Sequence, residues 1–236
     1  DFGAGSLRDT YHLSNSRFEV DAIDTNIGQL KLSYNKYDWS QVKYKPNIQG
    51  GSTVDLDNKQ CAYDLILAFD VIEHLIALDD TIKQLRNKLN KNGLMFISVP
   101  NRLTFFEKLF KLQHERNLRR GSIDKSGTPH VNFMTPHEWK QFFSNKGFIV
   151  NDHDMSIGFF VNDVWHGLFG IPIGLFVEPI IRRIATLTDM RYKANSFAEM
   201  FYPRWLMKFV NEIDETTKKY FKERWAWNLF VLSRRN

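Results

Sequence analysis

Cysteine is almost absent from this sequence. Its 236 residues include a single one, Cys61, so neither a disulfide scaffold nor a cysteine-rich zinc cluster can form within the chain. A chain without disulfides is typical of a reducing compartment. Because no signal-peptide pattern is recognisable either, we expect a cytoplasmic protein.

Long apolar runs and a strong charge of one sign are also missing. The longest uncharged apolar stretch, Val164 to Val177, includes His166 and is too short to span a bilayer. It is interpreted either as a cap over the core or as a peripheral membrane contact, since Trp165 and Phe169 lie near Arg182 in the sequence. The formal net charge of +5 suits an anionic surface without demanding nucleic acid.

What the sequence does contain is an alternation of strand and helix patterns. Apolar segments of strand length, some of them continuous enough for strands buried on both faces, occupy residues 18–23, 63–69, 94–99, 148–151 and 225–232. Helical patterns separate several of these segments. This alternation predicts an α/β protein with a doubly wound, largely parallel sheet.

Two of the expected helices carry end signals. Asp79 is predicted to cap a helix with apolar residues at helical spacing, and residues 91–93 (Lys-Asn-Gly) are predicted to close it. Thr135 and Glu138 have the spacing of a capping box, with Pro136 at the first helical position. Each helix is followed directly by one of the strands above.

A glycine turn, Gly3-Ala4-Gly5, precedes an acid at the end of the next expected strand, Asp24. In a doubly wound sheet such glycines let a ligand approach the backbone, and the acid accepts hydrogen bonds from both ribose hydroxyls. A glycine turn of this type normally follows a buried strand, so we expect a first strand, truncated here, ahead of Asp1. The alternative is that these glycines form a flexible end.

The residue that follows this turn indicates which nucleotide to expect. A dinucleotide site needs a small residue five positions after Gly3, where this sequence has Arg8, and the Gly-Lys-Ser/Thr pattern of a P-loop does not occur. A ribose-bearing cofactor without a pyrophosphate fits better. We therefore expect S-adenosylmethionine.

Several segments resemble, in the right order, the class I S-adenosylmethionine-dependent methyltransferases. Asp1 to Gly5 looks like their first motif, and Val20 to Asp24 looks like their second strand. Tyr63 to Leu75 resembles the fourth-strand motif of the branch that includes ubiquinone-biosynthesis O-methyltransferases. Leu89 to Asn101 is similar to the next helix end and fifth strand of that branch, and His130 to Phe148 to its segment before strand six. The resemblance covers about the first 151 residues and the end of the chain.

The resemblance implies a single methyltransferase domain, residues 1–236, with a seven-stranded, mostly parallel sheet, an antiparallel last strand and helices on both faces. Two inserts on the substrate side, 102–128 and 159–221, match nothing in the family pattern, and the second is expected to form a helical lid before the last strand. A helical stripe in the second insert is predicted to pack on the sheet or on a second subunit, as in a homodimer. Its members are Tyr202, Trp205, Leu206, Phe209, Val210 and Ile213.

The resemblance also implies roles for residues of the first two motifs. Gly3 and Gly5 would contact the methionine part of the cofactor, with Asp1 near its amino group. Asp24 would hold the ribose. These four positions define the expected cofactor site.

Further cofactor contacts are implied at the fourth strand and before it. Phe69 and Asp70, at the carboxyl end of this strand, would lie beside the cofactor where the substrate enters. Many relatives carry an acid for the adenine amino group about twelve residues before the position of Asp64, where this sequence has Ser52. Ser52 or Thr53 is expected to substitute for that acid.

Three residues are candidates for proton transfer. His130 follows Pro129 in a loop, where a neutral imidazole could take a proton from a hydroxyl during methyl transfer. Glu73 is interpreted either as a helix cap stabilised by the amino-end dipole or as a functional carboxylate, and His74 as a packed histidine or a base. Because the sequence shows no cluster of metal ligands, no intrinsic metal ion is expected.

The predicted activity is methyl transfer to a small or lipid- or sugar-linked acceptor, at oxygen. If the two inserts meet on the cofactor side, they would form an apolar floor with a positive rim, which suits an amphipathic acceptor bearing an anionic group. A non-catalytic binding protein with a methyltransferase-like fold is the alternative. Nucleic acid is not an expected acceptor, because the Asn/Asp-Pro-Pro-aromatic motif of amino-group DNA methylases is absent and Cys61 does not follow a proline.

Overall fold

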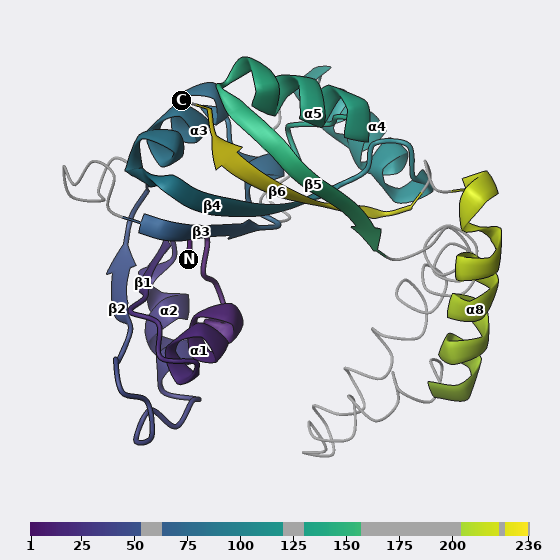
Figure 1. Ribbon diagram of the computed structural model, residues 1–236. Helices are drawn as coiled ribbons and strands as arrows, with labels where there is room; N and C mark the ends of the chain where they lie inside the picture. The colour runs from purple at the N-terminus through teal and green to yellow at the C-terminus, as the bar shows by residue number, and fades with distance from the viewer. Residues whose placement is uncertain (53–62, 120–129, 157–203, 222–224, 236) are drawn as a thin grey trace. The chain divides into compact units, whose positions relative to one another are not determined.

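The computed structural model describes residues 1–52, 63–119, 130–156, 204–221 and 225–235 (Figure 1). The chain divides into two compact units. Residues 1–100, 124–154 and 228–236 form the first, and residues 101–123 with 155–227 form the second. The second unit contains most of the two ranges expected to be inserts. That the second of these ranges, 159–221, forms a helical lid stays a prediction.

Six strands are present in the described parts of the chain, in two sheets. β1 (Asp21–Asp24) and β2 (Asn47–Gly50) pair in parallel. The larger sheet has the order β3-β4-β6-β5, with bounds Tyr63–Phe69, Leu89–Pro100, Trp227–Arg234 and Phe148–Ser156 respectively. β3 and β4 are parallel, and the last strand, β6, is antiparallel as predicted (Figure 1).

A short segment at Phe2 connects the two sheets. Phe2 forms a parallel bridge with Ile23 of β1, and its N–H donates to the carbonyl oxygen of Leu67 in β3 over 2.8 Å. In the part of the chain that the structure describes, backbone pairing links β1 and β3 only through this segment, which lies between them and is too short to count as a strand. The predicted seven-stranded sheet is therefore corrected to one sheet of two strands and one of four within the described residues.

The larger hydrophobic core lies between the four-stranded sheet and two helices on one of its faces, α3 (Leu78–Lys88) and α5 (Pro136–Asn145) (Figure 1). Ile82 and Leu85 of α3 are buried there with Trp139 and Phe143 of α5. The ring of Phe143 meets Phe230 of β6 edge to face at a centroid distance of 5.3 Å. This packing fixes the strands whose ends form the site below.

Helix α5 begins as the sequence predicts. Thr135 Oγ1 accepts the N–H of Glu138 over 3.2 Å, and Glu138 Oε2 accepts the N–H of Thr135 over 2.6 Å. Both halves of the capping box are therefore present, with Pro136 at the start of the helix.

Helix α3 departs from the prediction at both ends. Its cap residue is Ala77, and Asp79 lies inside the first turn. The negative charge of Asp79 interacts favourably with the positive end of the helix dipole, and its carboxylate forms an ion pair with Lys146. The helix ends at Lys88 because Leu89 is extended, fully buried and paired with Tyr63 at the start of β4. Gly93 lies inside that strand, where an added Cβ would come within 2.8 Å of Leu89 Cδ1.

The remaining helices belong to both units. α1 (Arg8–Asn15) and α2 (Ile27–Tyr34) belong to the first unit, whose smaller core cluster includes Leu7 and Leu30. η1 (Ile72–His74) is a short 3₁₀ turn after β3. In the second unit, α4 (Phe105–Arg119) lies within the first insert range, 102–128, and α8 (Arg204–Phe221) forms the end of the second, 159–221.

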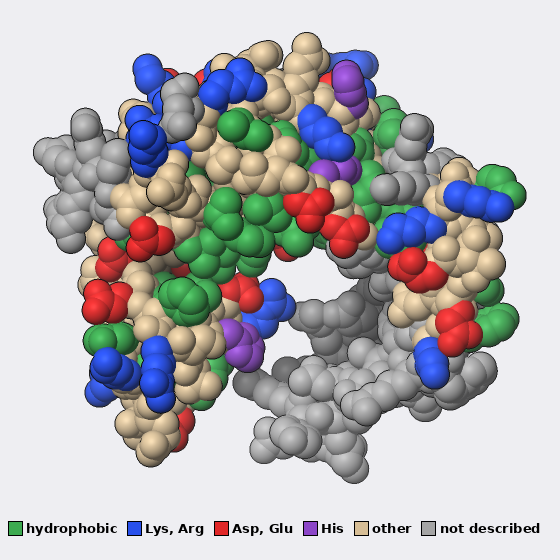
Figure 2. Space-filling view, in the orientation of Figure 1, with side chains coloured by type: hydrophobic (Ala, Val, Ile, Leu, Met, Phe, Trp, Pro, Cys, Tyr) green, Lys and Arg blue, Asp and Glu red, His purple; other side chains and the backbone are tan. Residues whose placement is uncertain are grey.

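The predicted helical stripe and the predicted membrane-interface segment are only partly open to description. In α8, Val210 is buried whereas Phe209 is 56% exposed. The other aromatic side chains of the stripe, and residues 164–177, lie outside the described residues. Among the residues that the structure describes, no helix combines the length and the apolarity needed to cross a membrane. On the face drawn in Figure 2, basic and acidic side chains are interspersed.

Candidate functional site

The carboxyl ends of β1, β2 and β3 border one cavity of about 380 Å³. Asp24 is the last residue of β1, Gly51 and Ser52 follow β2, and Asp70 and Val71 follow β3. Open α/β sheets bind their ligands at this edge, and small-molecule sites are typically about 300–1,000 Å³ in volume. The cavity therefore has the position and the size of a cofactor site.

Gly3 forms part of the cavity wall in a conformation that only glycine adopts easily. Its φ is +75°, and an added Cβ would lie 2.1 Å from Cγ2 of Val71. Its N–H donates to the carbonyl oxygen of Ile23 over 2.8 Å, which ties the turn to the end of β1. A side chain at Gly3 would push the turn and the Val71 segment apart.

The carboxylate of Asp24 is held by two backbone amides. Gly5 N–H donates to Oδ2 over 3.0 Å, and Asn26 N–H donates to Oδ1 over 2.8 Å. Each carboxylate oxygen can accept more than one hydrogen bond, so Asp24 can still accept from a diol such as the ribose hydroxyls. The predicted pairing of the glycine turn with Asp24 thus exists as a direct contact.

Asp70 has a left-handed backbone conformation, with φ +56°. Its N–H donates to both the carbonyl oxygen and Oγ of Ser98, each over 3.2 Å, and the hydroxyl of Ser98 donates to Asp70 Oδ1. Residues other than glycine rarely adopt this region, and such conformations concentrate at functional sites. Ser98 on β4 therefore holds Asp70 in place at the cavity.

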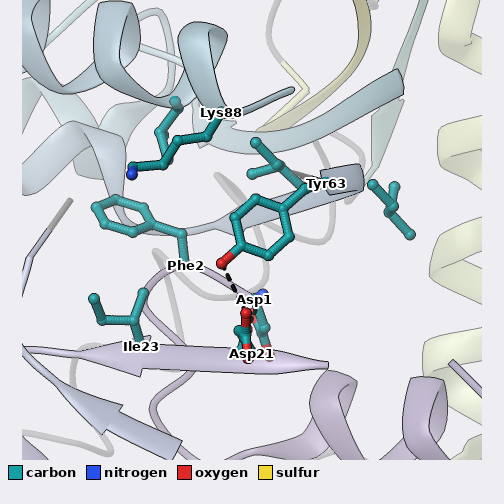
Figure 3. Close-up of a pocket in the computed structure, with 9 residues that line it drawn as sticks. Asp1, Phe2, Asp21, Ile23, Tyr63 and Lys88 are labelled. Atoms are coloured by element: carbon teal, nitrogen blue, oxygen red, sulfur yellow. Dashed lines mark hydrogen bonds between the residues drawn. The ribbon is translucent and has the colours of Figure 1, made fainter. Parts of the chain in front are cut away.

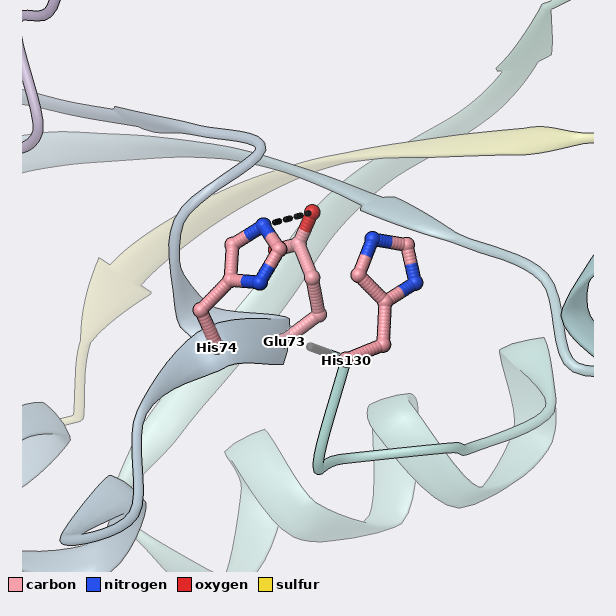
Figure 4. Close-up of side chains that lie close together, drawn as sticks. All are labelled: Glu73, His74 and His130. Carbon is pink, nitrogen blue, oxygen red and sulfur yellow. Dashed lines mark ion pairs between the residues drawn. The ribbon is translucent and has the colours of Figure 1, made fainter. Parts of the chain in front are cut away.

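Two histidines and a buried glutamate gather beside this cavity (Figure 4). Glu73 is fully buried, its Oε1 lies 3.9 Å from His74 Nε2, and the ring of His130 meets that of His74 edge to face at 4.7 Å. One ligand atom from each of the three residues lies within 4.8 Å of the others, so the cluster could hold a metal ion or serve as a proton acceptor. Only His74 of the three lines the cavity.

The position of His130 is set by its neighbours in the chain. The N–H groups of Val131 and Asn132 donate to the carbonyl oxygen of Glu73 over 2.8 and 3.0 Å. Nδ2 of Asn132 donates to the carbonyl oxygens of Ile72 and Leu75 over 2.9 and 2.7 Å. The segment before α5 is thereby attached to η1.

Four of the residues predicted to bind the cofactor line this one cavity: Gly3, Asp24, Ser52 and Asp70. Gly5 reaches it through its bond to Asp24. Phe69 ends β3 and pairs in register with Ser98, outside the described lining. His130 contacts His74 but is not among the residues that line the cavity (Figure 4).

Asp1 lies elsewhere, beside a cavity of about 20 Å³ (Figure 3). The other residues there include Asp21 and Tyr63, which begin β1 and β3, and Tyr63 Oη donates to Asp21 Oδ2 over 2.8 Å. This space holds about one water molecule, but the same three residues also border a larger cavity of about 540 Å³ near the starts of β1 and β3. The carboxylate of Asp1 accepts from Thr10 Oγ1 over 2.6 Å, and its role toward the cofactor stays a prediction.

Sequence reasoning missed three residues that shape the site. Val71 packs against Gly3, Ser98 holds Asp70, and Asn132 attaches the His130 segment. Ser98 could have been found, since it lies near the carboxyl end of the strand next to β3. Folding brings His130 to Glu73 and His74 from a distant part of the chain, which no spacing in the sequence indicated; that the protein needs no intrinsic metal ion stays a prediction.

Comparison with known proteins agrees with this geometry. Residues 1–153 match a protein family described as "Methyltransferase domain". The chain belongs to this family. A ubiquinone biosynthesis O-methyltransferase of Bartonella quintana (strain Toulouse) is 30% identical over 148 residues, which cover 62% of this chain and 57% of that relative. The match thus spans little more than half the length of the relative.

Among solved structures, both a methyltransferase and an enzyme with a different activity share this fold. A SAM dependent methyltransferase from Archaeoglobus fulgidus matches with a TM-score of 0.56 and 11% identity, over 98% of this chain and 83% of that one. The [4+2]-cyclase SpnF matches with a TM-score of 0.56 and 10% identity, over 99% and 72%. The methyltransferase-domain family makes S-adenosylmethionine the expected cofactor, whereas the fold alone does not determine the reaction.

Proposed function

We propose that this methyltransferase domain transfers the methyl group of S-adenosylmethionine to an oxygen atom of a small or lipid- or sugar-linked acceptor. The observation that carries the proposal is the cavity bordered by Gly3, Asp24 and Asp70, with two histidines beside it. The cofactor supplies an electrophilic methyl group. The protein then has to hold it, align the acceptor and receive a proton.

The residues of the cavity fit the parts of the cofactor. Gly3 and Gly5 expose backbone where the methionine part would lie, and Asp24 offers a carboxylate to the ribose. Ser52 stands where relatives place an acid for the adenine. The described lining contains two carboxylates and no Lys or Arg, which favours a cationic ligand over a phosphate-bearing one.

Transfer to oxygen is the finer part of the proposal. A hydroxyl acceptor must lose its proton, and we assign the role of base to His130, which acts beside His74 and Glu73. The curated relative from Bartonella quintana is an O-methyltransferase by name, which supports oxygen as the target. The lipid part of the acceptor is proposed from the aromatic range 164–177, outside the described residues.

A non-catalytic protein of the same fold is the second candidate. The absence of the adenine-contacting acid, where this chain has Ser52, favours it. Such a protein is expected to have a filled or collapsed pocket. The open cavity of about 380 Å³ at Asp24 and Asp70 supports the enzyme instead.

The test is a methyl-transfer assay with S-adenosylmethionine labelled in its methyl group. Three acceptors are offered: a prenylated hydroxybenzoate, a lipid-linked sugar with free hydroxyls, and an aliphatic amine. We expect label on a hydroxyl-bearing acceptor, and a rate about 100-fold lower for His130→Asn, since a positioned base typically contributes about 10²–10⁴-fold. Calorimetry should give the same cofactor affinity for both proteins, because His130 does not line the cavity.

His137→Gln is the matched control, because this exposed histidine lies on α5 and not in the cluster. Its transfer rate should equal that of the wild type. Treatment with EDTA should also leave the rate unchanged; a rate lost with EDTA and restored by a divalent cation would assign the cluster to a metal ion instead. Absence of S-adenosylmethionine binding would refute the proposal as a whole.

A further inference from the structure

The cavity at the ends of β1, β2 and β3 has an excess of negative charge. Asp24 and Asp70 both line it, and none of its described lining residues is Lys or Arg. His74 also lines it and adds a positive charge only when protonated. A ligand that carries a positive charge is stabilised in such a cavity relative to a neutral ligand of the same shape.

The two carboxylates differ in how far the protein already balances their charge. Both oxygens of Asp24 accept backbone N–H groups, from Gly5 and Asn26. Asp70 Oδ1 accepts the hydroxyl of Ser98, and the Asp70 side chain is exposed at the cavity. Asp70 is therefore the carboxylate whose charge acts most on a bound ligand.

Ser98 determines where that charge stands. Its carbonyl oxygen and Oγ both accept the N–H of Asp70, and its hydroxyl donates to the Asp70 carboxylate. These bonds stabilise a φ of +56° that an aspartate would otherwise rarely adopt. Without the hydroxyl, the N–H of Asp70 keeps only the Ser98 carbonyl oxygen as an acceptor from this residue, and the Asp70 carboxylate loses its bond from Ser98.

We propose that Asp70, positioned by Ser98, makes this site bind the sulfonium cofactor more tightly than the product of the reaction. The inference rests on the proposed function. During transfer the acceptor oxygen bonds to the methyl carbon, the carbon–sulfur bond breaks with its electron pair left on sulfur, and the acceptor proton passes to a base. Sulfur changes from a cationic sulfonium to a neutral thioether, so S-adenosylhomocysteine carries one positive charge fewer.

The consequence is that methyl transfer removes the attraction that held the cofactor. The loss of charge weakens binding at Asp70 and favours exchange of product for fresh cofactor. Arg8 is a positive charge that partly balances Asp70 and so weakens its attraction for a cationic ligand. Its hydrogen bond to Asp9 and, to a smaller extent, the charge of Asp70 raise the pKa of its guanidinium, which keeps this charge in place. Because Arg8 is exposed and bonded to Asp9 over 3.3 Å, it offsets only part of the effect.

Calorimetry on the full chain with S-adenosylmethionine and with S-adenosylhomocysteine tests this inference. For Asp70→Asn we expect cofactor affinity to fall about five- to tenfold and product affinity to change less than about twofold, because only the cofactor carries the extra charge. The ratio of the two dissociation constants is the readout. Raising the salt concentration should reduce this preference in the wild type.

Ser98 and Asp64 supply the matched variants. Ser98→Ala should lower the preference for the cofactor part of the way toward Asp70→Asn, and Ser98→Thr, which keeps the hydroxyl, should restore it. Asp64→Asn removes the same charge from the opposite end of β3, where Asp64 accepts from Asn90 Nδ2 over 2.6 Å, and should leave the preference unchanged.

Two results separate this inference from the proposed function. If Asp70→Asn weakens cofactor and product equally, the charge of Asp70 does not discriminate, and the inference is overturned while the enzyme remains. If the wild-type chain binds neither molecule, the proposed function fails and this inference fails with it. An unchanged preference in Ser98→Ala would remove Ser98 as the positioning residue.

Discussion

At the scale of single residues, the site depends on a contact between a glycine and a valine. Gly3 stands so close to Val71 that an added Cβ would lie 2.1 Å from its Cγ2, and its φ of +75° is unfavourable for alanine. Both residues line the cofactor cavity, one from the glycine turn and one from the segment after β3. Their contact keeps the turn against the strand end.

Gly3→Ala should therefore damage both stability and binding. We expect the free energy of unfolding to fall by about 2–3 kcal/mol, since overpacking and a positive φ act together. Calorimetry should show at least about tenfold weaker binding of S-adenosylmethionine, because the turn must move away from the cavity.

Two variants show whether the contact is the cause. Val71→Ala in the Gly3→Ala background should recover part of the loss, since it removes the methyl groups that the new Cβ meets. Gly28→Ala, inside α2, makes the same change where the nearest atom is 3.4 Å away and should be neutral or slightly stabilising. An equal loss at Gly28 would contradict the argument from Val71.

At the scale of elements, the best-defined boundary is the start of α5. The reciprocal bonds between Thr135 and Glu138 satisfy two backbone N–H groups at the helix start. Trp139 and Phe143 follow on the buried face and pack against each other at a centroid distance of 5.6 Å. A frayed first turn would disturb both the core and the preceding segment that carries His130.

Thr135→Ala should lower the free energy of unfolding by about 1 kcal/mol, the usual value for a lost side-chain cap. Urea denaturation followed by circular dichroism measures this directly. Thr216→Ala in α8 is the control, because Thr216 is exposed inside a helix and bonds only back to the carbonyl oxygen of Glu212. A loss of the same size at Thr216 would show that the measured effect is not one of capping.

At the scale of the whole molecule, the cofactor cavity belongs to one unit. All residues of its described lining lie in residues 1–100, within the first compact unit. A ligand that binds the folded state alone adds stability by mass action. S-adenosylmethionine should therefore stabilise the first unit, whatever the second unit does.

With S-adenosylmethionine at about 100 times its dissociation constant, the gain should be about 2.7 kcal/mol. Urea denaturation with and without the cofactor measures it. Asp24→Ala at the same cofactor concentration should gain much less, because its affinity is lower. No gain for the wild type at a saturating concentration would contradict the assignment of the cavity.

Local and positional signals in the sequence predicted much of this molecule. The buried strand at Tyr63–Phe69, the capping box at Thr135 and the approach of the glycine turn to Asp24 follow from short-range patterns. The start of α3 was predicted two residues too late, at Asp79 instead of Ala77, because an acid is favourable both as a cap and inside the first turn. Gly93 resembled a helix stop, but close packing against Leu89 explains the glycine better.

Contacts between distant segments could not be predicted in the same way. Neither Asn132 nor the approach of His130 to Glu73 is marked by any spacing, because the fold alone determines which loop meets η1. The left-handed Asp70 is likewise set by Ser98 on another strand. Side-chain contacts between segments that are distant in the sequence were therefore the part of the site that the sequence did not predict.

The bridge at Phe2 has a consequence for the order of folding. Its N–H bonds to Leu67, far along the chain, so this contact closes a long loop, and the conformational entropy of that loop must be lost before the two sheets are joined. The cavity needs Asp24 from one sheet, Asp70 from the other and Gly3 between them. The cofactor site is thus absent until the two sheets have joined. Because the cofactor binds only after this late step, we expect it to slow unfolding more than it speeds folding.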